Sequence, residues 1–337
     1  MDKALAIQIQ VIEILGTDEV YLVGGSVRDL VMGNEPKDYD FTTPMLPEEM
    51  VEKVKAAGRR VYTIGEKFGT IGFKVEYTER NDYGGKENIG SWGPQWHSST
   101  TYEYVEVTTF RSEVYTSKSR KPDVQFVASL EEDLARRDFT MNAMVLRPDG
   151  SIYDPYGGKL HIHKKHIVTV GLPKDRIQED PLRMLRAARF AARYGFTIDA
   201  NFIGKARQLA DRIYDVSVER WVQELDKLLC SDFTENGLLE LKNMGILTRI
   251  LPEVDAVLRM YPEFEGIEFF GGGVVCADAD YAWKEVLGWT GLAFMERPND
   301  SRNKLTRYVN TGICARLKFS NNRTKIVLGM DKPQKKD

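Results

Sequence analysis

The chain has 337 residues, of which 42% are hydrophobic and 29% charged, and its formal net charge is −3 at pH 7. This length allows well-buried cores and exceeds what one compact domain usually needs, so two or three domains are expected. The near-neutral charge excludes a global basic field for nucleic acid, although a basic patch on one face remains compatible with it. The three cysteines are far apart and predict neither disulfides nor a zinc site. Without a signal peptide or a membrane-length apolar run, a cytoplasmic protein with no membrane contact is expected.

The first part of the sequence alternates between helical and strand patterns. Helical spacing occurs in "MDKALAIQIQVIEIL", "SVRDLVMG" and "LPEEMVEKVKAAG", the last with acidic residues in its first turn. Strand patterns occur in "VYLVGG", "DYDFTT", "RVYTIG", "GTIGFKVEYT" and "TYEYVEVTTF". This mixture predicts a small α/β or α+β sheet domain that ends at about residue 150.

A segment rich in Gly, Asn and Ser, residues 79–100, separates two of these strand patterns. The composition predicts a long hairpin loop. Two interpretations are open: a flap that contacts RNA or a partner through Trp92, Trp96 and His97, or a tolerated surface insertion.

After about residue 175 the patterns become helical and the second half is expected to be mainly α. The segment "EDPLRMLRAARFAARYGF" has Pro181 in the first turn of the expected helix. Asp180 and Arg183 would then lie on one face of one helical turn, at positions i and i+3.

Two aspartates, Asp38 and Asp40, alternate within the strand pattern "KDYDFTT" and should point to the same side of a sheet. Two carboxylates held close repel each other unless a cation lies between them. Mg²⁺ suits such a site because it takes oxygen ligands and leaves positions for water and substrate phosphates. Glu106, in "YVEVTTF", would join the pair if its strand adjoins theirs. These residues predict metal-assisted phosphoryl transfer.

Gly24 and Gly25 end a strand pattern and open a helical one. Glycines at such a turn let backbone N–H groups approach a phosphate, and the N-terminus of a helix favours an anion. Arg28, one turn later, can add a bidentate contact. A triphosphate-binding turn is therefore expected beside the acids.

Taken together, the segment "GGSVRDLVMGNEPKDYDFTT" resembles the head-domain signature G-G-x-V-R-D-x₃-G-x₄-D-x-D-x₂-T of the class II tRNA nucleotidyltransferase/poly(A) polymerase family. Four later blocks are similar to that family in the same order: "EEDLARRDFTMNAM", "DPYGG", "EDPLRMLRAARFAARYGF" and "SVERWVQELDKLL". The resemblance is dense over residues 20–230 and thin beyond. The region that would grip the elbow of a tRNA is thus expected to be reduced.

The resemblance implies an α+β protein: a nucleotidyltransferase-type head with a mixed sheet flanked by helices over residues 1–150, a helical neck over 151–230 and a helical body over 231–337. It implies a CCA-adding enzyme that transfers CMP, CMP and AMP from CTP and ATP to the 3′ end of tRNA, with Mg²⁺ and without a nucleic-acid template. Residue by residue, it assigns metal binding to Asp38 and Asp40, the third carboxylate to Glu106, and the triphosphate grip to Gly24, Gly25 and Arg28.

The neck residues offer a chemical basis for choosing C and A. Both bases present an exocyclic amine next to a ring-nitrogen acceptor, whereas U and G present a carbonyl there. An aspartate such as Asp180 can accept from the amine, and an arginine such as Arg183 can donate to the ring nitrogen. The resemblance gives this pair the role of a template made of protein.

The other blocks supply further candidate nucleotide-binding residues. Arg136 and Arg137 could hold the triphosphate, and the carboxylate of Asp138 could accept from a ribose 2′-hydroxyl. Asn142 could reach the nucleotide or cap a turn. Arg186 and Arg189 could brace the nucleotide along the neck helix. Residues 111–123 resemble the loop that the family uses in the switch from C to A addition.

Two alternatives stay open. A poly(A) polymerase, or an enzyme that adds CC or A alone, would share nearly every motif. A catalytically silent RNA-binding protein on the same scaffold is the second, and the intact set of acids argues against it.

Overall fold

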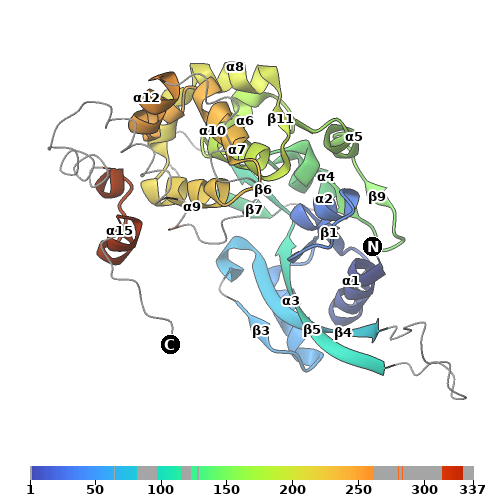
Figure 1. Ribbon diagram of the computed structural model, residues 1–337. Helices are drawn as coiled ribbons and strands as arrows, with labels where there is room; N and C mark the ends of the chain where they lie inside the picture. The colour runs from blue at the N-terminus through green and yellow to red at the C-terminus, as the bar shows by residue number, and fades with distance from the viewer. Residues whose placement is uncertain are drawn as a thin grey trace, which may run out of the picture. The chain divides into compact units, whose positions relative to one another are not determined.

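The computed structural model describes residues 2–63, 65–81, 97–114, 123–126, 129–260, 280, 283 and 313–328. Two compact units make up the chain, Met1–Ile162 and His163–Asp337 (Figure 1). The first unit carries a mixed sheet with helices and the second is mainly helical, so the expected α+β fold class is confirmed. The expected division into head, neck and body remains a prediction.

The described elements of the first unit follow the alternation expected from the sequence. They are α1 (Asp2–Leu15), β1 (Tyr21–Val23), α2 (Gly25–Val31), β2 (Tyr39–Thr43), α3 (Pro47–Ala56), β3 (Val61–Tyr62), the 3₁₀ turn η1 (Glu66–Phe68), β4 (Thr70–Asn81), β5 (His97–Thr109), β6 (Arg111–Val114), β7 (Asp123–Phe126), α4 (Leu130–Ala135), η2 (Thr140–Asn142), β8 (Val145–Leu146), β9 (Ile152–Tyr153) and α5 (Gly158–His163).

Seven of these strands form one sheet in the order β3-β4-β5-β2-β1-β8-β9. Strand β2 pairs with β5 in parallel, and the other neighbours in this sheet pair antiparallel. The sheet is therefore mixed. Its one parallel pair brings together the two strands that carry the candidate acids.

The central strands of the sheet have one buried and one open face. Side chains that alternate along β4 and β5 are fully buried, and α1 and α3 contact β4. Burying one such side chain stabilises the fold by about 1.5–3 kcal/mol. The residues between them point to the opposite face, which carries the acids. The buried set comprises Ile71, Phe73, Val75, Val105 and Val107.

The predicted hairpin is present, because β4 and β5 pair antiparallel from Thr70 opposite Thr108 to Asn81 opposite His97. The predicted loop bounds, 79–100, are wrong at both ends, because strand pairing continues to Asn81 and resumes at His97. Its tip, residues 82–96, lies outside the described residues. The two interpretations of Trp92 and Trp96 are therefore not tested.

The second unit is built from helices with a small parallel pair of strands. Its described elements are β10 (His166–Ile167), α6 (Pro173–Glu179), α7 (Arg183–Tyr194), β11 (Thr197–Ile198), α8 (Ala200–Gln208), η3 (Ala210–Asp215), α9 (Val218–Leu229), α10 (Thr234–Asn243), α11 (Leu247–Ile250), α12 (Pro252–Met260) and α15 (Asn321–Val327). Among the described residues of the whole chain, no helix combines the length and apolarity needed to cross a bilayer.

Helix α7 packs against α9 and α10 in this unit. Its contact with α10 depends on small residues. A Cβ atom placed on Gly237 would lie 2.7 Å from the Cβ atom of Ala192 and 3.0 Å from the carbonyl oxygen of Ala188. Glycine at this position allows the two helices to approach closely.

Candidate active site

The two strands that carry the candidate acids adjoin, as expected. Asp40 in β2 lies opposite Glu106 in β5, in the register of the parallel pair. Residues paired in this way point to the same face of a sheet. Asp38 precedes β2 by one residue, and all three acidic residues are exposed. The structure therefore brings the three predicted acids to the open face at the β2–β5 pair, which lies in the interior of the sheet.

The acids interact electrostatically. Removal of hydration by surrounding protein atoms raises the pKa of Asp40 to about 6, although its side chain keeps contact with solvent. The negative charges of Glu106 and Asp38 raise this pKa further, and Arg137 lowers it. Repulsion of this kind favours a cation among the carboxylates.

The donor set fits Mg²⁺, which is a hard cation with oxygen ligands. Within the described part of the chain, no three His, Cys, Asp or Glu side chains lie close enough to form a complete metal site. Mg²⁺ usually keeps several waters and takes only one or two carboxylates together with substrate phosphates. Asp38 and Asp40 match that requirement.

The glycine turn lies between β1 and α2 and lets two arginines approach its backbone. Gly24 has φ 73° and ψ −128°, a conformation that L side chains rarely adopt. A Cβ atom on Gly24 would lie 3.1 Å from Nη1 of Arg137, and one on Gly25 would lie 3.3 Å from Nη2 of Arg28. Because Arg137 also acts on the pKa of Asp40, its guanidinium lies near both the turn and the acids.

Arg28 belongs to a buried polar network that brings together several predicted nucleotide-binding residues. Its Nη1 atom donates to Oδ1 of Asn142 over 2.7 Å, and its Nε and Nη2 atoms donate to Oδ1 of Asp29. Asn142 in turn donates from Nδ2 to Oδ1 of Asp138 over 3.0 Å. The backbone N–H of Phe139 donates to the same oxygen. The network fixes the direction of the Arg28 guanidinium between Asp29 of its own helix, α2, and Asn142 of η2.

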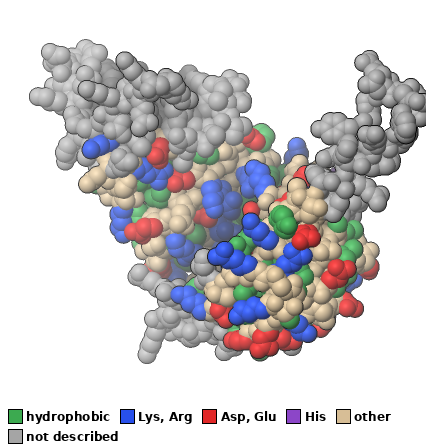
Figure 2. Space-filling model, turned by 90° about the horizontal axis from the view of Figure 1, so that it is seen from below, with side chains coloured by type: hydrophobic (Ala, Val, Ile, Leu, Met, Phe, Trp, Pro, Cys, Tyr) green, Lys and Arg blue, Asp and Glu red, His purple; other side chains and the backbone are tan. Residues whose placement is uncertain are grey.

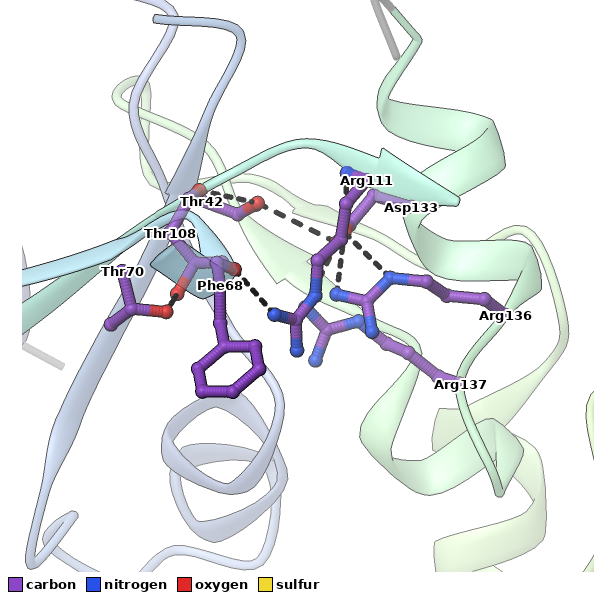
Figure 3. A network of polar contacts seen from close by, with 8 residues as sticks. All are labelled: Thr42, Phe68, Thr70, Thr108, Arg111, Asp133, Arg136 and Arg137. Carbon is purple, nitrogen blue, oxygen red and sulfur yellow. Dashed lines mark hydrogen bonds and ion pairs between the residues drawn. The ribbon is translucent and has the colours of Figure 1, made fainter. Parts of the chain in front are cut away.

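Arg136 and Arg137 are held by Asp133, a fully buried residue that sequence analysis missed (Figure 3). Arg136 donates to Oδ1 of Asp133 from Nε and Nη2, over 3.0 and 2.8 Å, and Arg137 donates to Oδ2 over 3.0 Å. Burial alone would raise the pKa of Asp133, but Arg137 and Arg136 more than offset this effect and hold the pKa below its usual value.

The same carboxylate also accepts from the backbone N–H of Arg111 and from the hydroxyl of Thr42, over 3.3 and 3.5 Å. It thereby joins the end of β2, the start of β6 and the two arginines after α4. The i, i+3 and i, i+4 spacing in "DLARR" was the available sequence signal.

Arg111 lies at the base of the hairpin formed by β6 and β7, opposite Phe126. Its Nη1 atom donates to the carbonyl oxygen of Phe68 over 2.6 Å (Figure 3). The turn of this hairpin, residues 115–122, lies outside the described residues, so most of the predicted switching loop is not tested.

In the second unit, the prediction that Asp180 and Arg183 lie in the same helix is wrong, because Asp180 is not helical. Helix α7 begins at Arg183, and Asp180 is the extended residue after α6, with φ −140° and ψ 102°. Pro181 explains the difference, because a proline disfavours the α conformation of the residue before it. The backbone N–H of Arg183 still donates to the carbonyl oxygen of Asp180, so the two residues stay within one turn.

Each member of this pair has a charged partner of its own. Arg220 donates to Oδ2 of Asp180 over 2.8 Å. The buried Arg183 donates from Nη1 to Glu179 over 2.6 Å and to the carbonyl oxygen of Arg176. Sequence analysis gave no role to Arg220, and no local spacing connects it to Asp180.

Further along α7, Arg189 and Arg186 share an acid on α9. Arg189 donates from Nε to Glu224 over 2.5 Å, and Arg186 lies 3.8 Å from the same carboxylate. The guanidinium of Arg189 also lies 4.1 Å from the ring centre of Phe190. Both Arg189 and Glu224 are buried, so this pair braces α7 against α9.

The mixed sheet with its acids and the arginines after α4 define a nucleotidyltransferase-type head domain. The family described as "Poly A polymerase head domain" matches residues 20–168, and the one described as "Probable RNA and SrmB- binding site of polymerase A" matches residues 195–258. The first unit of the chain therefore has the head domain of the tRNA nucleotidyltransferase and poly(A) polymerase family, as its motifs predicted.

Curated relatives agree with this assignment. The chain is 37% identical over 243 residues to the CCA-adding enzyme of Geobacillus kaustophilus, a match that covers 72% of this chain and 53% of the relative. It is also 37% identical over 257 residues to the CCA-adding enzyme of Bacillus subtilis, covering 75% of this chain and 56% of the relative. The chain thus spans only part of the length of these proteins.

Solved structures show the same fold. The crystal structure of the Bacillus stearothermophilus CCA-adding enzyme in complex with CTP superposes with a TM-score of 0.56 at 25% identity, covering 92% of this chain and 82% of the other. A CCA-adding enzyme in its apo form II gives a TM-score of 0.62 at 20% identity, covering 96% and 77%.

Proposed function

We propose that this chain adds CCA to the 3′ end of tRNA, using CTP and ATP as substrates and Mg²⁺ as cofactor. The observation that carries the proposal is the register of Asp40 and Glu106, with Asp38 beside them and Arg137 close to both the acids and the glycine turn. The relatives named above, and the CTP complex among the solved structures, support the choice of reaction.

In the proposed reaction, the terminal 3′-hydroxyl of the RNA attacks the α-phosphorus of the nucleotide. A new O–P bond forms, the proton of the hydroxyl passes to solvent, the bond from the α-phosphorus to the bridging oxygen breaks, and pyrophosphate leaves. Asp38 and Asp40 would hold Mg²⁺, which when bound would supply activation of the hydroxyl and stabilisation of charge on the leaving oxygen. The carboxylate of Glu106 would accept the hydrogen bond that orients the hydroxyl.

The arginines of the first unit would hold the triphosphate. Arg136 and Arg137 are bound to Asp133, which fixes their direction before the substrate arrives. Such preorganised cations stabilise the charge that develops on phosphate oxygens. Gly24, Gly25 and Arg28 would place backbone N–H groups and the first turn of α2 against the same phosphates. Asp138 and Asn142 would contact the ribose.

Asp180 and Arg183 would choose the base by the hydrogen bonds of its edge. The ion pairs that these residues make with Arg220 and Glu179 position them before the base arrives. A mismatched edge leaves a polar group without a partner, which costs about 1–3 kcal/mol. Two such mismatches would therefore weaken the binding of U or G relative to C or A. Arg186 and Arg189 would keep α7 in place for this contact.

The test is incorporation into a tRNA that lacks its three terminal nucleotides, offered each of the four labelled NTPs. Addition of two C residues and one A, without U or G, is expected. A long run of A without C would identify a poly(A) polymerase, and C without A would identify a CC-adding enzyme. RNA binding without any incorporation would overturn the enzymatic proposal.

A further inference from the structure

Tyr104 lies across the neighbouring strand on the open face of the sheet. Strand pairing places Gly72 of β4 opposite Glu106 and Lys74 opposite Tyr104. A Cβ atom built on Gly72 would lie 2.0 Å from the hydroxyl oxygen of Tyr104, 2.6 Å from its Cζ and 3.0 Å from its Cε2. These distances leave no room for any side chain other than hydrogen. The ring therefore rests on the backbone at Gly72.

The rest of the Tyr104 ring is open on one side and supported on another. Tyr104 is 44% exposed, so one side of its ring is open to solvent. The ring of Tyr62 meets it edge-on, with ring centres 5.8 Å apart and an angle of 66° between the planes. The guanidinium of Arg60 lies 5.1 Å from the centre of the Tyr62 ring. The result is an aromatic surface with a cation at its margin.

This surface adjoins the acids. Tyr104 and Glu106 are separated by two positions on β5, so they share a face and their Cα atoms are about 6.8 Å apart along the strand. Burial and then the negative charge of Glu106 raise the pKa of the Tyr104 hydroxyl, so the two side chains lie near each other. Glu106 in turn lies opposite Asp40. Tyr104 is thus the next side chain from the acids on this face of β5.

We propose that the exposed side of the Tyr104 ring stacks against the 3′-terminal base of the acceptor RNA. This inference rests on the proposed function, because the reaction requires the terminal 3′-hydroxyl to lie at the acids. The base on the same ribose must then lie within one nucleotide of them, where Tyr104 is exposed.

Stacking suits this acceptor for a chemical reason. The last base of the RNA is not the same at every step: the base before CCA is terminal at the first addition, and a C is terminal at the second and third. A contact that reads hydrogen bonds would therefore not fit all three steps. Aromatic stacking tolerates any base, because every base has a π-face.

The experiment compares Tyr104→Ala, Tyr104→Phe and the matched control Tyr102→Ala. Tyr102 is on the same strand and face, is 59% exposed, and lies two positions further from Glu106. In Tyr104→Ala, the KM for tRNA should rise about 5- to 150-fold, the factor that corresponds to a stacking contribution of about 1–3 kcal/mol. The KM for CTP should stay within about twofold. Tyr104→Phe and Tyr102→Ala should change the KM for tRNA by less than about threefold.

A second readout needs no catalysis. The fluorescence of a tRNA with 2-aminopurine as its last base should fall on binding the wild-type protein or Tyr104→Phe. It should stay at the level of the free tRNA on binding Tyr104→Ala. Gly72→Ala, which displaces the ring, should act like Tyr104→Ala, and the two changes together should cost no more than either alone.

Quenching and a KM for tRNA that stay unchanged in Tyr104→Ala would overturn the inference. A rise in the KM for CTP in place of that for tRNA would also overturn it and would assign the ring to the incoming base. The proposed function fails separately: a wild-type protein that quenches the probe but incorporates no nucleotide would contradict the reaction and leave the stacking intact.

Discussion

Asp40 and Glu106 face each other across the one parallel pair of the seven-stranded sheet, although they lie far apart in the sequence. Antiparallel neighbours flank this pair on both sides. The parallel pairing therefore decides which acids meet and on which face they point.

Replacement of either Asp38 or Asp40 should abolish nucleotide transfer without preventing the protein from binding RNA. Asp38→Ala and Asp40→Ala are each expected to lower kcat by at least about 10²–10³-fold, the usual cost of losing one preorganised electrostatic contact. Single-turnover incorporation of CMP measures the effect. Affinity for tRNA by filter binding is the control, and full activity in either variant would refute the metal assignment.

The raised pKa of Asp40 predicts a pH dependence of stability in the metal-free protein. The folded-state value of about 6 exceeds the unfolded value of about 3.9. Between these values the folded state binds more protons, so this group makes the protein less stable as the pH rises through that window. Asp40→Asn should therefore raise the melting temperature, measured in EDTA, at pH 8 and not at pH 4. Saturating Mg²⁺ should reduce this difference at pH 8, and a gain confined to pH 4 would contradict the sign.

Asp133→Asn should lower both stability and affinity for nucleotides. It leaves two arginines without a buried anion, a loss that typically costs about 3–5 kcal/mol. The KM for CTP should rise by about tenfold, because Arg136 and Arg137 lose their fixed direction. The matched control is Glu132→Gln, an exposed carboxylate on the same helix. Equal effects in the two variants, by urea unfolding and initial rates, would rule out the positioning role.

Arg183→Ala should weaken base choice more than it weakens triphosphate binding. The ratio of kcat/KM for CTP to that for UTP should fall by about tenfold, since a base-edge contact is worth about 1–3 kcal/mol. Arg193→Ala, in the last turn of the same helix, is the control and should leave the ratio unchanged. A CTP-to-UTP ratio that survives Arg183→Ala would refute the template role.

Two glycines of the second unit should respond to alanine in opposite ways. Gly237→Ala places a methyl group 2.7 Å from Ala192 and should cost about 1–3 kcal/mol through overpacking. Gly204 lies inside α8, where a Cβ atom would meet no heavy atom within 4 Å, so Gly204→Ala should stabilise by about 0.5–1 kcal/mol. Melting temperatures that move in the same direction would contradict the packing of α7 on α10.

Local chemistry made much of the first unit predictable. Alternation of apolar residues identified β4 and β5, and the same alternation placed Glu106 on the face opposite Val105 and Val107. The sequence could not show that β2 pairs with β5, because strand order depends on the whole topology. The grouping of Glu106 with the two aspartates was therefore predicted only on the assumption that their strands adjoin. The face shown in Figure 2 carries both Lys or Arg and Asp or Glu side chains, which agrees with the net charge of −3.

Other features needed the structure. The contacts of Asp133 with Thr42 and Arg111 join segments that no periodicity connects. The resting place of Tyr104 on Gly72 requires the register of two long strands. The conformation of Asp180, in contrast, could have been foreseen from Pro181, because the restriction before a proline is local.

The acceptor geometry of Asp133 has a consequence for any attempt to redesign this protein. Its Oδ1 atom serves both the guanidinium of Arg136 and the main chain at Arg111, where the β6–β7 hairpin starts. Replacing this hairpin with one from another protein would therefore also change the hydration and the orientation of Arg136. Swapped hairpins should be exchanged together with α4 and its two arginines, as one inseparable module.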